Sequence, residues 1–290
     1  MPGLNLPFNL TFDLIAIGDV IAATIVTAHI LLNKRNVRAA VGWIGLAWFS
    51  PILGSAIYFI FGINRVERRA TRLRHRTELS AASESAAPTL DLASVIPESI
   101  LSLAKVGGRL TNDPIVAGNS ITFFQSGDEA YPVMLEAIHS ARKSIALASY
   151  IFRADHVGNV FIEALCAAHR KGVEIRVLVD GIGSGYFFSS AARALLRAGI
   201  PVERFLHDWL PWRMPFLNMR NHKKLLIIDG AIGFTGGLNL GGENIQKPRI
   251  ARAVEDIHFK VQGPAVSMLM RSFMDDWTFT CDEILDGPVW

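Results

Sequence analysis

The sequence is poor in cysteine and in charged residues. Of its 290 residues only 2 are cysteine and 19% are charged, whereas 50% are hydrophobic, and the formal net charge is +3. The two cysteines, Cys166 and Cys281, lie far apart and fit neither a disulfide scaffold nor a zinc ribbon. The low charge excludes a disordered chain, and a mean hydropathy of +0.30 is high for an ordinary soluble enzyme. We expect a globular domain attached to a membrane segment.

The apolar residues are concentrated near the N-terminus. Residues 14–32 contain one charged residue, Asp19, and residues 39–64 contain none. About 20 apolar residues of helix cross the hydrocarbon core of a bilayer, so both stretches are long enough. The alternative is a cleaved signal peptide, but no Lys or Arg precedes the first stretch and no convincing cleavage site follows it. The sequence therefore predicts a retained transmembrane helical hairpin within residues 1–64, with helices over about 14–32 and 41–62.

Basic residues flank the predicted hairpin unevenly. The short loop between the helices carries Lys34, Arg35 and Arg38, whereas six arginines follow the second helix between residues 65 and 76. Because positive charge is retained in the cytoplasm, this difference predicts that the chain beyond the hairpin is cytoplasmic. The same arginines could bind anionic lipid head groups or do no more than fix the topology.

A change of pattern marks the rest of the chain. Residues 65–118 form a predicted basic juxtamembrane segment and linker, and residues 119–290 alternate between strand and helix patterns. Strands separated by a helix imply right-handed crossovers, so the fold class is α/β, an α/β/α sandwich with a mostly parallel mixed sheet. The predicted strands are 143–152, 174–180, 202–206, 222–229, 231–236 and 256–263, and the predicted helices are 158–170, 189–198 and 264–278.

The pair Asp229-Gly230 lies between two apolar runs and predicts a β-hairpin. A type I′ turn needs positive φ at both central residues, which Asp-Gly supplies. In that register Lys224 faces Thr235 and His222 faces Gly237. His222 and Lys224 are two residues apart, so both side chains leave the same face of the strand.

Opposite these side chains the sequence places Gly236 and Gly237, with Asn239 just beyond. An imidazole, an ammonium and an amide beside bare backbone suit a tetrahedral anion, with Lys224 and Asn239 donating to oxygens while His222 approaches phosphorus. Asp229 lies in the turn, an odd number of residues from both His222 and Lys224, so its side chain should leave the opposite face. We therefore expect Asp229 to support the loop and not to contact substrate. Singly, each residue has an ordinary structural explanation, but the joint spacing is harder to dismiss.

The pattern His222-x-Lys224-x4-Asp229, followed by Gly236-Gly237-x-Asn239, resembles the HKD motif of the phospholipase D superfamily. Its surroundings resemble bacterial cardiolipin synthases, whose two-helix anchor carries Trp, Pro, Gly, Tyr and Phe-Gly in order. The matching residues are Trp48, Pro51, Gly54, Tyr58, Phe61 and Gly62, and residues 149–184 and 256–277 are similar as well. One local departure is Val254, where the family has tryptophan.

The resemblance implies a phospholipase D-like domain that needs no metal and no cofactor, and the eight histidines are scattered along the chain. It implies a catalytic set of His222, Lys224 and Asp229, and a phosphate-binding set of Lys224, Asn239, Gly236 and Gly237. Asp256 is the better candidate, and Glu243 the rival, for orienting His222. The implied substrate is phosphatidylglycerol or another anionic phospholipid rather than nucleic acid, and the implied location is the bacterial inner membrane, multi-pass, with a cytoplasmic catalytic domain.

The family carries two HKD motifs, and this sequence has one. Its mechanism needs one histidine to form a phosphohistidine and another to protonate the leaving alkoxide, and a single imidazole does not easily do both. A homodimer, a partner chain with a second motif, or a truncated and inactive product would each account for the single motif. Besides a cardiolipin-forming transferase, a phospholipase D-type hydrolase and a lipid-binding remnant remain open.

Two further segments bear on function. Residues 205–217 combine prolines with large apolar side chains, and we expect Trp209 and Trp212 to dip into the head-group region, or to pack against a missing second half. Residues 180–186 follow a strand and are glycine-rich, but their spacing departs from the dinucleotide-binding motif, which indicates a plain loop.

Overall fold

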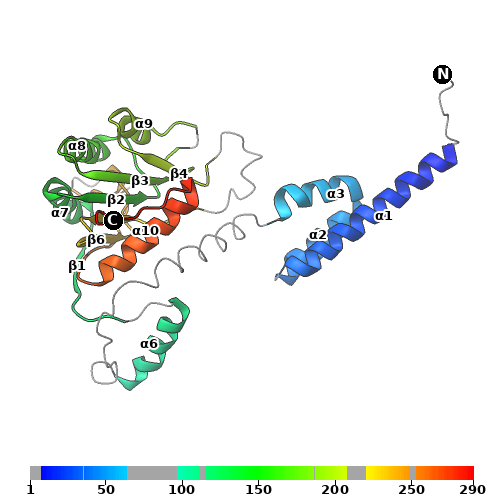
Figure 1. Ribbon diagram of the computed structural model, residues 1–290, viewed down its shortest axis with the longest axis horizontal. Coiled ribbons are helices and arrows are strands. Elements are labelled where there is room, and N and C mark those ends of the chain that lie inside the picture. Colours follow the sequence, from blue (N-terminus) through cyan, green and yellow to red (C-terminus); the bar gives the residue numbers. More distant parts are fainter. Residues whose placement is uncertain are drawn as a thin grey trace. The chain divides into compact units, whose positions relative to one another are not determined.

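The computed structural model describes residues 8–34, 36–63, 97–111, 115–185, 187–207, 220–247 and 253–290. The arginine-rich segment after residue 64, the first part of the predicted linker, and Trp209 and Trp212 lie outside these ranges. The chain divides into an N-terminal helical unit and a larger unit with the α/β fold (Figure 1).

The N-terminal unit contains one long apolar helix followed by shorter ones. Asp13–Asn33, within α1, is long and apolar enough to cross a membrane. The predicted second helix, 41–62, is interrupted at Ser50, where φ is −147° and ψ is 80°. Pro51 begins a new helix there because a proline is favourable in the first helical turn. The helices are α1 (Phe8–Asn33), α2 (Val37–Phe49), α3 (Pro51–Ile57) and a π-helical turn η1 (Tyr58–Gly62).

The larger unit is built on a seven-stranded mixed sheet in the order β1-β7-β6-β5-β2-β3-β4. β2 pairs with β3, and β3 with β4, in parallel, as the predicted crossovers require. The strands are β1 (Ser120–Phe124), β2 (Ser144–Ser149), β3 (Glu174–Asp180), β4 (Val202–Phe205), β5 (Leu225–Ile228), β6 (Ile232–Gly236) and β7 (His258–Gln262).

The expectation of a mostly parallel sheet is wrong, because most neighbouring strands pair antiparallel. The four remaining pairs, β1–β7, β7–β6, β6–β5 and β5–β2, are antiparallel. For β5 and β6 the physical reason is their connection of three residues, 229–231, which is too short for the crossover that parallel neighbours need. The half of the sheet next to the HKD residues is therefore a set of antiparallel strands beside a parallel half.

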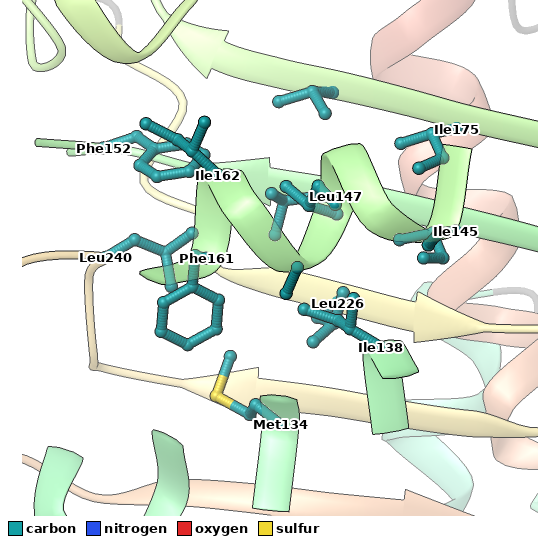
Figure 2. Close-up of a cluster of buried hydrophobic side chains, with 14 of the residues drawn as sticks. Met134, Ile138, Ile145, Leu147, Phe152, Phe161, Ile162, Ile175, Leu226 and Leu240 are labelled. Atoms are coloured by element: carbon teal, nitrogen blue, oxygen red, sulfur yellow. The ribbon is translucent and has the colours of Figure 1, made fainter. Parts of the chain in front are cut away.

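Helices cover both faces of the sheet, as the sequence predicts (Figure 1). Successive residues of β2 alternate between two cores, with Ile145 and Leu147 in one and Ala146 and Ala148 in the other. The first core lies under α7, α8 and α9, and Figure 2 shows its packed aliphatic and aromatic side chains. The second lies under α10. The helices are α7 (Gly127–Ser140), α8 (His156–Arg170), α9 (Ser190–Arg197) and α10 (Ala265–Cys281).

Three elements escape the sequence prediction. β1 and α7 precede the first predicted strand, and α6 (Glu98–Thr111) lies inside the predicted linker. β1 is an edge strand, with only Phe124 of its five residues buried, so it lacks a strong apolar signal. Pro132 interrupts the helical pattern of α7, although Met134 and Ile138 are buried on its inner face.

The register of the β5–β6 hairpin differs from the predicted register by one residue. Asp229 and Gly230 both have positive φ, 52° and 65°, as the turn requires. The ladder nevertheless pairs Ile228 with Ile232 and Leu225 with Thr235, so Ala231 is an extra residue between turn and strand. The extra residue shifts every pair of the hairpin by one position, so Leu225 and not Lys224 lies opposite Thr235.

Candidate active site

The centre of the candidate site is the ring of Tyr150, which directly follows β2. The imidazole of His222 stacks on this ring with centroids 4.1 Å apart and an interplanar angle of 16°. The ammonium of Lys224 lies 5.5 Å from the centroid of the same ring, and its Nζ donates to the carbonyl of His222 at 2.8 Å. His222 and Lys224 both precede β5, which begins at Leu225. The two HKD side chains thus meet on one aromatic ring, although neither residue belongs to the strand.

The residues on either side of His222 are held by two carboxylates. Buried Asp180, at the end of β3, accepts the backbone N–H of Asn221 at 2.9 Å. Asp276 of α10 accepts the side-chain amide of Asn221 at 2.9 Å and pairs with the ammonium of Lys223 at 2.8 Å. His222 itself stays exposed while its neighbours are fixed. These contacts hold the backbone of the segment that carries the imidazole.

The glycine-rich loop after Asp180 forms the support behind Tyr150. Asp180 accepts the N–H groups of Ile182 and Gly183 at 2.9 and 2.8 Å, which folds the loop back on itself. A Cβ at Gly183 would collide with the Tyr150 carbonyl and ring, so glycine is required for this approach. Ser184 donates to the Tyr150 carbonyl at 3.2 Å. The segment predicted as a plain loop is therefore part of the wall of the site.

Asn239 reaches the same place from the loop after β6. Its Oδ1 accepts the N–H of Ile151 at 3.2 Å, which leaves the amide nitrogen as the group that can donate to a ligand. The buried phenol of Tyr131 donates to the carbonyl of Asn239 at 2.7 Å, and Asn244 Oδ1 accepts the Asn239 N–H at 3.3 Å. Burial raises the pKa of Tyr131 far above its usual range, so the phenol remains a donor.

Asp256 lies against Gly237, so the expected open hollow at this glycine is wrong. A Cβ at Gly237 would collide with the Asp256 carboxylate, and one at Gly236 would meet His258 of β7. The space beside the two glycines is therefore occupied by the Asp256 carboxylate and the His258 imidazole. Burial lowers the pKa of Lys224, and the Asp256 carboxylate partly offsets this by favouring the ammonium.

The two candidates for orienting His222 are in different surroundings. Glu243 forms a salt bridge with Arg153 at 3.0 Å. Asp256 is exposed, and its carboxylate accepts the backbone N–H of Ile257 at 2.8 Å. Within the described part of the chain, neither carboxylate hydrogen-bonds to the imidazole of His222. The assignment of either acid to that role stays a prediction.

Asp229 lies away from this cluster, at the opposite end of β5 from Lys224. Its carboxylate accepts three backbone N–H groups, those of Arg142, Lys143 and Ser144, at 2.7 to 3.2 Å. Asp229 thus ties the hairpin turn to the start of β2, as parity predicts. The structure does not bring it together with the other two members of the predicted catalytic set.

Several contributors to the site were missed from the sequence. Tyr150 could have been suspected, because an aromatic residue at the carboxyl end of a buried strand occupies the edge where sites form. His258 is two residues from Asp256 and faces Gly236, but a histidine in an amphipathic strand gives no separate signal. Asn221, Asn244 and Asp276 act through contacts with residues far along the chain, which no local pattern shows.

Two models of known protein families match the chain. Residues 134–277 match the family model described as "Cardiolipin synthase, PLD-like domain", and residues 13–62 match "Phospholipase_D-nuclease N-terminal". This part of the chain is therefore a phospholipase D-like domain, preceded by the N-terminal segment of that superfamily. Within that class, the model that residues 134–277 match is the one described for cardiolipin synthases, as the surroundings of the HKD motif predict.

Curated relatives are named accordingly. The chain is 29% identical over 255 residues to cardiolipin synthase 1 of Bacillus anthracis, covering 86% of this chain and 50% of that protein. It is 30% identical over 269 residues to cardiolipin synthase of Halalkalibacterium halodurans, covering 89% and 52%. Cardiolipin synthase A of Pseudomonas aeruginosa is 29% identical over 273 residues, covering 91% and 55%. The chain thus spans about half the length of the curated relatives that it matches.

Solved structures of low sequence identity also match. Nuc from Salmonella typhimurium, a phospholipase D family member, has a TM-score of 0.45 at 22% identity, covering 58% of this chain and 100% of that chain. NucT from Helicobacter pylori has a TM-score of 0.43 at 14% identity, covering 56% and 98%.

Proposed function

We propose that this chain is the catalytic unit of a membrane-bound phosphatidyltransferase that forms cardiolipin from two phosphatidylglycerols. The observation that carries the proposal is the meeting of His222 and Lys224 on the ring of Tyr150, beside Asn239. The names of the relatives support the choice of lipid over other phosphodiesters.

In the proposed first step, a ring nitrogen of His222 attacks the phosphorus of one phosphatidylglycerol. The bond from phosphorus to the glycerol head-group oxygen breaks, and a second imidazole gives a proton to the leaving alkoxide. Lys224 and the Asn239 amide donate to the non-bridging oxygens, where negative charge is concentrated in the transition state. Free glycerol leaves, and the phosphatidyl group stays on His222.

In the second step, the primary hydroxyl of another phosphatidylglycerol attacks the same phosphorus. It passes its proton to the second imidazole while the bond from phosphorus to His222 breaks, so cardiolipin forms and both imidazoles return to their starting state. The second imidazole comes from a second copy of this chain or from a partner that carries another HKD motif. Proton transfer by such a positioned group contributes about 10²–10⁴-fold.

The contacts of the site suggest how it is positioned for this chemistry. Asp180 and Asp276 hold the backbone around His222, while Tyr150 supports the imidazole face to face. Asp256 lies against Gly237 and its charge acts on Lys224, and we assign it to stabilising the imidazolium that forms.

The proposal is tested by expressing the chain in bacterial membranes that contain phosphatidylglycerol and recording cardiolipin and phosphatidic acid. We expect cardiolipin from the wild type and at least about a thousandfold less from His222→Ala. Phosphatidic acid as the main product would identify the runner-up, a phospholipase D-type hydrolase. A folded wild-type chain that yields neither lipid would contradict a site completed by a second copy of this chain, and would favour a partner with its own HKD motif or a lipid-binding remnant.

A further inference from the structure

The second apolar segment of the N-terminal unit consists of two short helices. α2 has 13 residues, and α3 with η1 has 7 and 5. At 1.5 Å per residue these helices are about 20 and 18 Å long, whereas the hydrocarbon core of a bilayer is about 30 Å thick. Neither is long enough to cross, and apolar helices of this length occur in buried cores and in re-entrant or interfacial segments.

The chain reverses direction between these helices. A Cβ on Gly54 of α3 would collide with the carbonyl of Leu46 in α2, so the two helices lie in backbone contact. In one continuous helix these residues, eight apart, would be separated by about 12 Å. The missing side chain of Gly54 permits this close approach.

The turn at the tip of the reversal leaves few backbone groups unpaired. Ser50 donates its N–H to the Leu46 carbonyl at 3.1 Å, and its own carbonyl accepts the N–H of Gly54 at 2.6 Å. Pro51, the first residue of α3, has no N–H to satisfy. A turn of this kind suits a low-dielectric environment, where each unpaired backbone group costs several kcal/mol.

The returning helix ends where α2 began. Tyr58 is fully buried, and its hydroxyl lies 2.8 Å from Nδ1 of His29, near the end of α1. It also meets the ring of Trp43 edge-on at 5.5 Å. Ile63 packs against the same cluster, which includes Ile30. In a straight helix from Val37, Tyr58 would lie about 31 Å away from this end.

The outer surface of this unit is covered with large apolar side chains. Leu32, Val41, Phe49 and Ile52 are between 65% and 93% exposed, and no charged residue occurs from 39 to 64. A surface so continuously apolar fits the acyl chains of a bilayer.

We propose that α1 crosses the bilayer once, and that α2, α3 and η1 form a re-entrant hairpin that enters and leaves on the side of residues 34–36. Lys34 and Arg35 of that loop, Arg38 at the start of α2, and the six arginines between residues 65 and 76 then lie on one side of the membrane. Residues 1–13, without Lys or Arg, lie on the other. In this topology the positive-inside rule places the α/β unit in the cytoplasm. With two full spans, by contrast, the basic residues after α1 and the six arginines would lie on opposite sides of the membrane.

The test maps sidedness on the full chain with a membrane-impermeant maleimide. Single cysteines are introduced as Asn5→Cys, Val37→Cys and Glu163→Cys after both native cysteines are changed to alanine. We expect Val37→Cys and Glu163→Cys to react from the cytoplasmic side of oriented vesicles, and Asn5→Cys from the opposite side. Two full spans would place positions 5 and 163 together, with 37 opposite. That result, or labelling of all three positions from one side, would overturn the proposal.

A matched pair of glycine variants tests the hairpin itself. Ser55 is buried in α3, so in detergent a Ser55→Cys side chain should react slowly with maleimide. Adding Gly54→Val should raise the rate at least tenfold, because valine forces α3 away from α2. Adding Gly45→Val should leave the rate unchanged, because nothing lies within 4 Å of a Cβ there. Equal rates in the two valine variants would contradict the reversal. Neither experiment depends on catalytic activity.

Discussion

At the scale of single residues, the site combines one exposed imidazole with one buried imidazole. His222 is exposed on Tyr150, whereas His258 is 1% exposed beneath Gly236, and no described residue hydrogen-bonds to its Nδ1. Asp256 and Lys224 are the charged groups that act on His258, with opposite effects. Burial dominates and lowers the pKa of His258 from 6.5 to about 4. His258 is therefore neutral at physiological pH.

The buried state of His258 predicts a loss of stability in mild acid. Since its folded pKa lies below its unfolded value, the unfolded chain binds the proton first, and stability falls as the pH drops from 6.5 towards 4. The expected slope from this group is at most about 1.4 kcal/mol per pH unit. The check is the urea midpoint of the full chain in detergent across this range, for the wild type and His258→Asn. Parallel pH profiles for the two proteins would show that His258 has no part in the loss.

The stacking of His222 on Tyr150 predicts a graded response to substitution. Tyr150→Phe keeps the ring and should change cardiolipin formation less than threefold. Tyr150→Leu removes the flat support, and because a misplacement of about 1 Å can cost about 10²-fold, we expect at least a tenfold loss of activity. Rates are compared at equal amounts of folded protein. Equal activity of the leucine and phenylalanine variants would exclude a positioning role for the ring.

At the scale of elements, the β5–β6 hairpin separates chemistry from support. His222 and Lys224 lie before β5, and Asp229 lies after it on the backbone N–H groups at the start of β2. The strand between them consists of four fully buried aliphatic residues, so it fixes the distance between the two ends.

Removing the charge of Asp229 should therefore reduce stability more than catalysis. Asp229→Asn weakens three hydrogen bonds to a carboxylate, and we expect a loss of about 2 kcal/mol in the free energy of unfolding. Activity per folded molecule should stay within about threefold of the wild type. Asp286→Asn, at an exposed carboxylate, is the control and should change neither quantity. A loss of activity in Asp229→Asn as large as that in His222→Ala would contradict this prediction and indicate that Asp229 takes part in catalysis.

Periodicity predicted the parallel half of the sheet well. The segments that begin at Glu174 and Val202 are strands next to amphipathic helices, the first of them mostly buried, and their boundaries agree within one or two residues. The edge strand β1 and the one-residue shift of the hairpin were missed, because partial burial and an extra residue at a turn leave no mark in the pattern. Tyr150 and His222 are 72 positions apart, and only the folded sheet brings them together.

At the scale of the whole molecule, the single HKD motif predicts a dependence on pairing. If two copies share one site, a pair with one His222→Ala chain lacks either nucleophile or acid. Mixing wild type and His222→Ala in equal amounts, with free exchange, should then reduce the activity per wild-type chain to about half, because half of the wild-type chains have an inactive partner. Unchanged activity per wild-type chain would indicate that the second imidazole comes from a different partner.

The attachment of Asp229 to three backbone N–H groups also affects how the HKD signature is used to assign function. Selection for a stable fold would keep this aspartate in a descendant that had lost all turnover, because its hydrogen bonds serve the scaffold. Genome surveys that take this aspartate as proof of an enzyme would therefore include descendants without catalytic activity. If Tyr150→Leu loses activity as we expect, an aromatic residue aligned with Tyr150, present together with His222, is a better criterion for separating enzymes from inactive descendants.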